Sequence, residues 1–224
     1  MNSTNGDSLP FLVRDCSLVA ISTGKRAQNL RELRDHVLNI HEGSIYYHFW
    51  GGLLQPHFDD PQFNNDFANW SHYRLHDNIL AERLAVIDPT DFDDLESLRR
   101  ELVEILEQRL EELERPAWVP TDCQFHFVRS QIVVFDTGWR IEKPEHLPDL
   151  VGKMSVGSIF YHVIDARRRY PKGADDFQVW LRGFGGFERI CEKLASIDPY
   201  FVTLVELRRK LSTILRMGFR EALK

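Results

Sequence analysis

Most apolar positions along the chain recur every three or four residues, which is the spacing of amphipathic helices. Two stretches differ, because residues 11–24 and 125–138 are rich in β-branched and aromatic side chains and each ends in Thr-Gly. Each of these stretches predicts one strand closed by a turn. About four helices follow each strand when apolar periodicity is taken as the guide. We therefore expect a mainly α fold with a minor β element, an α+β arrangement.

The starts of the predicted helices carry residues that cap free backbone N–H groups. In the second half of the chain, Pro144 suits a first helical turn, because proline needs no N–H partner there. Side-chain oxygens at these starts are expected to act as caps rather than as catalytic groups. The expected caps are Ser44, Ser158, Asp66, Asp88, Asp176 and Asp198.

The same pattern occurs twice. Residues 43–48 (GSIYYH) return as 157–162 (GSIFYH), and residues 84–89 (LAVIDP) return as 194–199 (LASIDP). The offset falls from 114 residues at the first pair to 110 at the second. A repeat of this length is domain-sized and too long for a solenoid unit. It predicts two homologous helical lobes that arose by internal tandem duplication.

The repeat also sets the expected domain boundaries. Residues 1–9 are polar and predict a disordered tail, and residues 116–124 read as a linker. The first lobe then covers residues 10–115 and the second covers residues 125–224. A lone strand must pair with something, because its backbone groups need partners. We therefore expect the two opening strands to pair with each other across a pseudo-twofold axis.

The composition is that of an ordinary soluble protein, with 43% hydrophobic and 28% charged residues in 224. No apolar stretch approaches the roughly 20 residues of a membrane span, and the N-terminus lacks a signal-peptide pattern. The three cysteines are an odd number and lie far apart, which argues against a disulfide framework or a cysteine-rich metal site. We expect a cytoplasmic protein without a membrane partner.

The net charge of −6 is unevenly distributed. Residues 1–115 hold 11 basic and 21 acidic side chains, whereas residues 116–224 hold 17 and 13. Opposite signs favour docking of the halves or separate partners, although drift of solvated surface explains the difference equally. The one basic run, residues 167–172, is a predicted loop in an acidic chain. Nucleic acid is therefore not an expected partner.

The recurring Thr-Gly-x-Arg segment is the candidate ligand site. A glycine turn that leads from a strand into a helix presents free N–H groups, and an adjacent arginine adds capacity for phosphate or carboxylate. The segment is not a P-loop, because Gly-x-x-x-x-Gly-Lys-Ser/Thr is absent. The alternative is a tight turn with a solvated arginine. The candidate residues are Thr23, Gly24, Arg26, Thr137, Gly138 and Arg140.

Two Tyr-His pairs are the candidates for acid–base chemistry: Tyr47 with His48 and Tyr161 with His162. Histidine titrates near neutrality and a tyrosine can donate a hydrogen bond. The alternative is a buried histidine whose nitrogens are satisfied inside the protein.

Other motifs carry less chemistry. His72 and His76 have the spacing of a two-histidine metal face, but the glutamate of a metalloprotease motif is missing, so no metal site and no cofactor are expected. Trp70 and Trp180 each follow a phenylalanine by three residues, which favours packing in the core over stacking on a ligand.

Three segments of the first half resemble a known family. Residues 23–30 (TGKRAQNL), 65–70 (NDFANW) and 80–89 (LAERLAVIDP) are similar to an uncharacterised prokaryotic family, domain of unknown function 5752. The second half keeps the skeleton of these segments, with Trp139 at the position of Lys25. The resemblance implies relatives and no mechanism.

These observations favour a cytoplasmic, non-catalytic binding or regulatory protein for an anionic small molecule or a protein partner. An alternative is an enzyme that acts on a phosphorylated or sugar-like metabolite with a histidine general acid/base. A second alternative is a structural homodimer. The recurrent turn and the lack of an assignable catalytic set favour the first hypothesis.

Overall fold

The computed structural model describes residues 9–55, 62–113, 121, 123–170 and 173–222. The fold is mostly helical with one small antiparallel sheet of two strands, as expected for an α+β chain. The strands β1 (Phe11–Ala27) and β2 (Phe125–Ile141) are hydrogen-bonded to each other, so the predicted pairing of the two opening strands is confirmed. The tandem duplication itself stays a prediction.

The chain forms two compact units whose boundaries fall inside both strands. The central unit is Leu18–Ile132, and the terminal unit joins Met1–Ser17 to Val133–Lys224. These units differ from the contiguous lobes expected at residues 10–115 and 125–224, because the helices of each unit pack on a segment of both strands. Of the expected tail, only Leu9 lies within the described residues, and most of the expected linker lies outside them.

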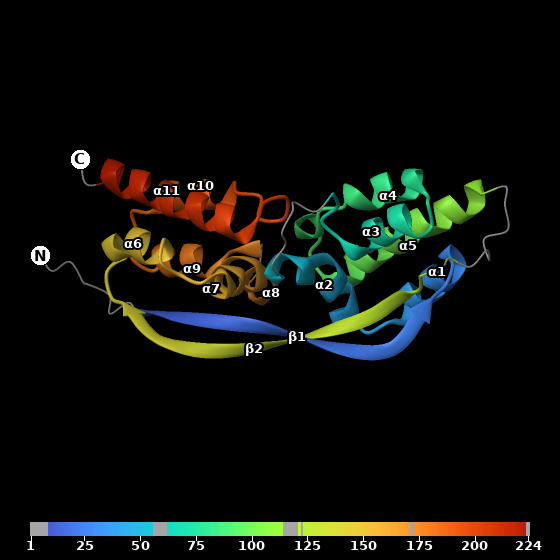
Figure 1. Ribbon diagram of the computed structural model, residues 1–224. Helices are drawn as coiled ribbons and strands as arrows, with labels where there is room; N and C mark the ends of the chain where they lie inside the picture. The colour runs from blue at the N-terminus through green and yellow to red at the C-terminus, as the bar shows by residue number, and fades with distance from the viewer. Residues whose placement is uncertain (1–8, 56–61, 114–120, 122, 171–172, 223–224) are drawn as a thin grey trace, which may run out of the picture. The chain divides into compact units, whose positions relative to one another are not determined.

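The helices of the central unit lie on one side of its part of the strand pair (Figure 1). Among them, α3 packs on α4, and α5 packs on α1, α2 and α4. Phe125 and Phe127 alternate along β2 and are buried against these helices, while His126 between them points away from the core. This alternation is that of a strand with one covered face. The helices are α1 (Leu30–Asn39), α2 (Glu42–Trp50), α3 (Asp66–Tyr73), α4 (Asn78–Ala85) and α5 (Leu95–Glu112), with 3₁₀ turns η1 (Gly51–Leu54) and η2 (Pro89–Asp91).

The terminal unit has the same plan, although the helices that correspond to α1 and α2 are shorter. Phe11 and Val13 of β1 are buried under α9 and its neighbours, as Phe125 and Phe127 are in the central unit. Its longest helix, α11, packs on α6, α7 and α10. The elements are η3 (Pro144–His146), α6 (Leu147–Val151), α7 (Val156–Ile159), the π-helical η4 (Phe160–Asp165), α8 (Ala166–Arg169), α9 (Asp176–Arg182), α10 (Glu188–Ala195) and α11 (Leu204–Ala222).

Two local expectations about helix starts and strand ends were wrong. The cap of α2 is His41 and the cap of α7 is Ser155, so Ser44 and Ser158 lie inside their helices. Ser44 is buried, and its hydroxyl donates to the Val128 carbonyl of β2 at 2.8 Å. This serine therefore ties α2 to the strand rather than capping a helix.

The Thr-Gly pairs do not end the strands. Both glycines have a positive φ, 72° at Gly24 and 77° at Gly138, yet β1 continues to Ala27 and β2 to Ile141. A glycine in the left-handed region introduces a local irregularity into the strand without a side-chain clash. The segment predicted as a turn between strand and helix is therefore strand.

Two further expectations concern the basic run and the membrane. Residues 167–169 form most of α8, so this part of the predicted basic loop is helical. In the described part of the chain, no helix combines the length and the hydrophobicity needed to cross a bilayer.

Candidate ligand-binding site

His48 is a buried histidine with both ring nitrogens hydrogen-bonded inside the central unit. Its Nδ1 lies 2.8 Å from Oδ2 of Asp66, and its Nε2 accepts the backbone N–H of Val128 at 3.1 Å. A nitrogen that accepts a backbone N–H carries no proton, so Nδ1 holds the proton and donates it to Asp66. Phe67 and Phe125 pack on the imidazole, with centroid distances of 5.4 and 4.7 Å. The ring is thus fixed as a neutral link between α2, α3 and β2.

Asp66 reaches this histidine because its neighbour takes the capping role. Asn65 is the N-cap of α3, and its Oδ1 accepts the N–H of Ala68 at 2.8 Å. The expectation that Asp66 caps the helix was therefore wrong, since Asp66 is the first helical residue. Its side chain is 46% exposed, so one face of the carboxylate meets His48 and the other meets solvent.

The terminal unit repeats this arrangement. His162 Nδ1 lies 2.6 Å from Oδ2 of Asp176, and its Nε2 accepts the N–H of Arg14 at 2.9 Å. Asp175 is the N-cap of α9, so the prediction that Asp176 caps this helix was also wrong. A tryptophan also bonds to the backbone in each unit. In the terminal unit, the indole of Trp180 donates to the carbonyl of Leu9 at 2.9 Å.

The central unit has the matching indole bond, from Trp70 to the carbonyl of Cys123 at 2.8 Å. Trp70 is buried and Phe67 is fully buried, which confirms core packing for this pair. The threonine hydroxyls recur in the same way: Thr23 donates to Phe127 O and Thr137 to Val13 O, both at 2.6 Å. Both units therefore share four bonds in this region: the two bonds of the histidine, the indole bond and the threonine bond.

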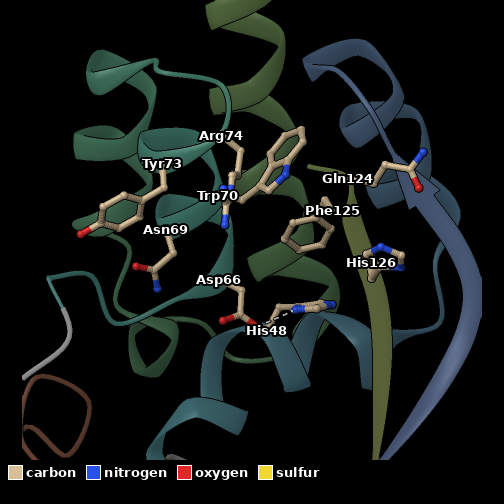
Figure 2. Close-up of a pocket in the computed structure, with 9 residues that line it drawn as sticks. All are labelled: His48, Asp66, Asn69, Trp70, Tyr73, Arg74, Gln124, Phe125 and His126. Carbon is tan, nitrogen blue, oxygen red and sulfur yellow. Dashed lines mark hydrogen bonds and ion pairs between the residues drawn. The ribbon is translucent and has the colours of Figure 1, made fainter. Parts of the chain in front are cut away.

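A pocket of about 440 Å³ lies beside His48 in the central unit (Figure 2). One wall is α3 with the residue after it, and the other is the start of β2. The indole of Trp70 and the ring of Phe125 lie between these walls (Figure 2). The polar lining residues are Asp66, Asn69, Tyr73, Arg74, Gln124 and His126.

The pocket offers acceptors along α3. Asn69 donates its amide N–H groups to the carbonyls of Phe63 and Asn65, which leaves its Oδ1 available. Tyr73 donates its hydroxyl to Gln62 at 2.8 Å, which leaves lone pairs on that oxygen. Oδ1 of Asp66 adds a charged acceptor at the same wall.

The pocket also offers donors. Arg74 follows α3 and is exposed, and it has no ion-pair partner among the described residues. Gln124 accepts Arg26 Nη1 at 3.3 Å through Oε1, so its amide N–H groups remain available. His126 contributes a third group with nitrogen atoms. A ligand that carries both an anionic group and hydrogen-bond donors matches this lining.

The equivalent pocket of the terminal unit is smaller, about 280 Å³, and an arginine of the protein occupies part of its rim. Arg169 binds Oδ2 of Asp176 and Oδ2 of Asp165, each at 2.8 Å. Its guanidinium carbon lies 4.0 Å from the ring centroid of Tyr161, a cation–π contact. The side chain of Asp176 is only 12% exposed as a result.

The Thr-Gly-x-Arg residues predicted to bind an anion lie elsewhere. Both segments are inside strands, so the argument from a helix N-terminus does not apply to them. Arg140 is bound to both carboxylate oxygens of Asp136, at 2.9 and 2.8 Å, and this pairing lowers the pKa of Asp136 to about 2. Arg26 reaches the pocket only through Gln124. Sequence reasoning missed Arg74 and Gln124, which no motif distinguishes.

The histidines proposed for acid–base chemistry are held by internal bonds, as the alternative interpretation of them expected. The rings of Tyr47 and His48 are near perpendicular, and Tyr47 accepts a hydrogen bond from Gln55 rather than facing the imidazole. His72 and His76 share no helix face, because α3 ends at Tyr73. Within the described ranges, no cluster of three histidine, cysteine or acidic residues is suited to a metal ion.

The paired strands and helical units with a polar pocket define a mainly helical protein with a candidate small-molecule site. The chain belongs to the family of unknown function DUF5752, whose sequence profile matches residues 8–216. It is similar to the solved structure of OrfY from Thermoproteus tenax, with 29% identity and a TM-score of 0.81 over 93% of this chain and 95% of that one. No curated protein sequence matches the chain.

Proposed function

We propose that this protein is a non-catalytic binding protein with a regulatory role, and that its ligand is a small metabolite with a carboxylate or phosphate group. The ligand site is the pocket of the central unit. A guanidinium binds carboxylate and phosphate through parallel N–H groups, and here it lines the same pocket as an amide and an imidazole. The observation that carries the proposal is Arg74 on the pocket wall without a carboxylate partner in the described part of the chain.

The internal bonds of His48 support binding rather than catalysis. A general base needs a free lone pair within reach of the proton that it removes. The Nε2 lone pair of His48 is engaged by Val128, and its Nδ1 proton is engaged by Asp66. An enzyme built on this histidine would have to break one of these bonds in each turnover.

The cytoplasm is the proposed location, which the three unpaired cysteines favour. We also propose that the two halves of the chain, residues 10–115 and 125–224, arose by tandem duplication. The matching bonds of His48 and His162 support this origin, because each imidazole links a helix, an aspartate and a strand in the same order.

A calorimetric titration with phosphorylated and carboxylated metabolites tests the function. Arg74→Ala should weaken binding of the responding compound by about tenfold or more, since a hydrogen bond to a charged group contributes about 1.5–3 kcal/mol. Arg31→Ala, at an exposed position on α1, is the matched control and should bind as the wild type does. Equal binding by wild type and Arg74→Ala would exclude this pocket. If no compound binds and light scattering shows a dimer, the structural homodimer replaces the proposal.

A further inference from the structure

In the terminal unit, the guanidinium of Arg169 contacts the tyrosine and the aspartate that flank the histidine, and the described residues of the central unit have no cation at the matching position. Arg169 stands eight residues after Tyr161, and it lies on the Tyr161 ring while binding Asp176. In the central unit, Gln55 stands eight residues after Tyr47 and also contacts this tyrosine, with its amide 3.2 Å from the hydroxyl. A neutral amide thus stands where the other unit has a guanidinium.

The two positions share the same neighbouring tyrosine, histidine and aspartate. Each tyrosine ring lies edge-on to its histidine, with centroid distances of 5.3 Å for Tyr47 and 5.1 Å for Tyr161. Each histidine holds an aspartate through Nδ1. A further difference is Gly51, which stands at the position of Asp165 and brings no second carboxylate to that position.

The Asp66 carboxylate can therefore accept further hydrogen bonds or an ion pair. Its side chain is 46% exposed against 12% for Asp176, and Oδ1 has no hydrogen-bond partner among the described residues. Tyr47 and Asp66 both contact the imidazole of His48, the ring of Tyr47 at a centroid distance of 5.3 Å and the Asp66 carboxylate at 2.8 Å from Nδ1, so the two groups lie near one another. Burial raises the pKa of Tyr47, and the Asp66 carboxylate adds to the rise. Among the described residues, no cation occupies in the central unit the position that Arg169 fills in the terminal unit.

We propose that the ligand of the central pocket carries a guanidinium or ammonium group, which binds the exposed carboxylate of Asp66 at the pocket wall and extends onto the face of Tyr47 beside it. Arg169 is the internal example of this contact. The anionic end of the same ligand lies at Arg74, and this second half of the assignment rests on the proposed function.

The separation of the two charged residues sets the length of the ligand. Asp66 and Arg74 are eight positions apart, which corresponds to a rise of about 12 Å along a helix. The arginine side chain leans toward the helix N-terminus, which shortens the gap. The ligand class is therefore a zwitterion whose cation and anion are separated by several carbon atoms, such as an ω-guanidino or ω-amino acid.

Titrations with arginine, citrulline and agmatine test this assignment. Citrulline replaces the guanidinium by a neutral urea of the same shape, and agmatine lacks the carboxylate. Arginine should bind about tenfold or more tightly than citrulline, and Asp66→Asn should abolish this difference, because the asparagine keeps an acceptor for His48 without the charge. Gln55→Arg should remove arginine binding by filling the subsite from within, whereas Gln55→Met should retain it.

The outcomes separate the two proposals. If arginine and citrulline bind equally while Arg74→Ala weakens both, the cation subsite is refuted and the proposed function stands. If agmatine binds and loses affinity about tenfold in Asp66→Asn, but no compound depends on Arg74, the cation subsite stands and the anionic half fails. If none of the three compounds binds, the zwitterionic class is overturned. Residue 55 is exposed, so its variants do not disturb the core.

Discussion

Gly157→Ala should destabilise the protein strongly, because β1 passes directly over this glycine. A Cβ at position 157 would lie 2.5 Å from the carbonyl oxygen of Cys16 and would collide with the Asp15 carboxylate. The first of these obstacles is backbone, which cannot rotate away as a side chain can. The thiol of Cys16 also donates to the Gly157 carbonyl at 3.3 Å, so a shift of the strand would lengthen this bond.

The matched control is Gly43→Ala, the corresponding position of the other repeat. Its added Cβ would lie 3.1 Å from Nδ1 of His41, a contact that a small movement of the exposed imidazole relieves. It would lie 3.4 Å from the carbonyl oxygen of Ser130, which is an ordinary van der Waals distance. Replacement of a helical glycine by alanine contributes about 0.5–1 kcal/mol of stability where there is room. We expect Gly43→Ala to change the free energy of unfolding by less than about 1 kcal/mol in either direction.

The size of the Gly157→Ala effect follows from the cost of overpacking. An overpacked methyl costs typically about 1–3 kcal/mol, and the backbone contact places this site at the upper end, so about 2 kcal/mol remains after the helical gain of alanine. For a chain of this length, about 2 kcal/mol lowers Tm by about 4–8 °C. Thermal unfolding followed by circular dichroism measures both variants. Equal Tm values for the two variants would refute the close approach of β1 to α7.

Three further predictions concern Arg169 and the three cysteines. Arg169→Gln should raise the number of agmatine sites from one to two, by uncovering Asp176; unchanged stoichiometry in calorimetry would contradict the cation subsite. At pH 8 a thiol reagent should label Cys123 quickly and the other two cysteines only on unfolding, since burial raises the pKa of Cys16 to about 12 and also raises that of Cys191. Because the pKa of Cys16 is raised from 9.0 to about 12, the stability that its neutral thiol contributes is present below pH 9 and should be lost as pH rises from 9 toward 12. Urea unfolding of wild type and Cys16→Ala across this range measures the loss. If the urea midpoint declines equally in both proteins, Cys16 is not its source.

Local pattern predicted the helices and the two strands, because both depend on short-range spacing. The pairing of the strands is a long-range contact, and it was predicted from the need of a lone strand for backbone partners. The apolar positions of α1, Leu30, Leu33 and Val37, are buried as their periodicity indicated. The division of each strand between two units was not predictable in this way. It depends on which helices cover Phe127 and Val13, a long-range choice that alternation along one strand does not encode.

The site was only partly predictable, for two physical reasons. Asn65 and Asp66 both have side chains that cap helices, and only the extended backbone at Asn65, with φ −130° and ψ 154°, decides which of them does so. The contrast between Gln55 and Arg169 is visible in the sequence. The sequence does not show that each of these side chains contacts the tyrosine eight residues before it. The backbone after the tyrosine is a 3₁₀ turn in η1 and π-helical in η4, so the same spacing follows two different paths.

The division of the strands gives the chain an order of assembly during synthesis. The central unit has all of its residues once Ile132 has left the ribosome, so it can fold while the rest is still being translated. The terminal unit needs residues 11–17, which precede the central unit in the chain, and α11, which follows it. Its opening strand segment must therefore wait, unpaired with its helices, for most of the time that translation takes. A synonymous change that slows translation after Ile132 lengthens this wait without altering a single residue.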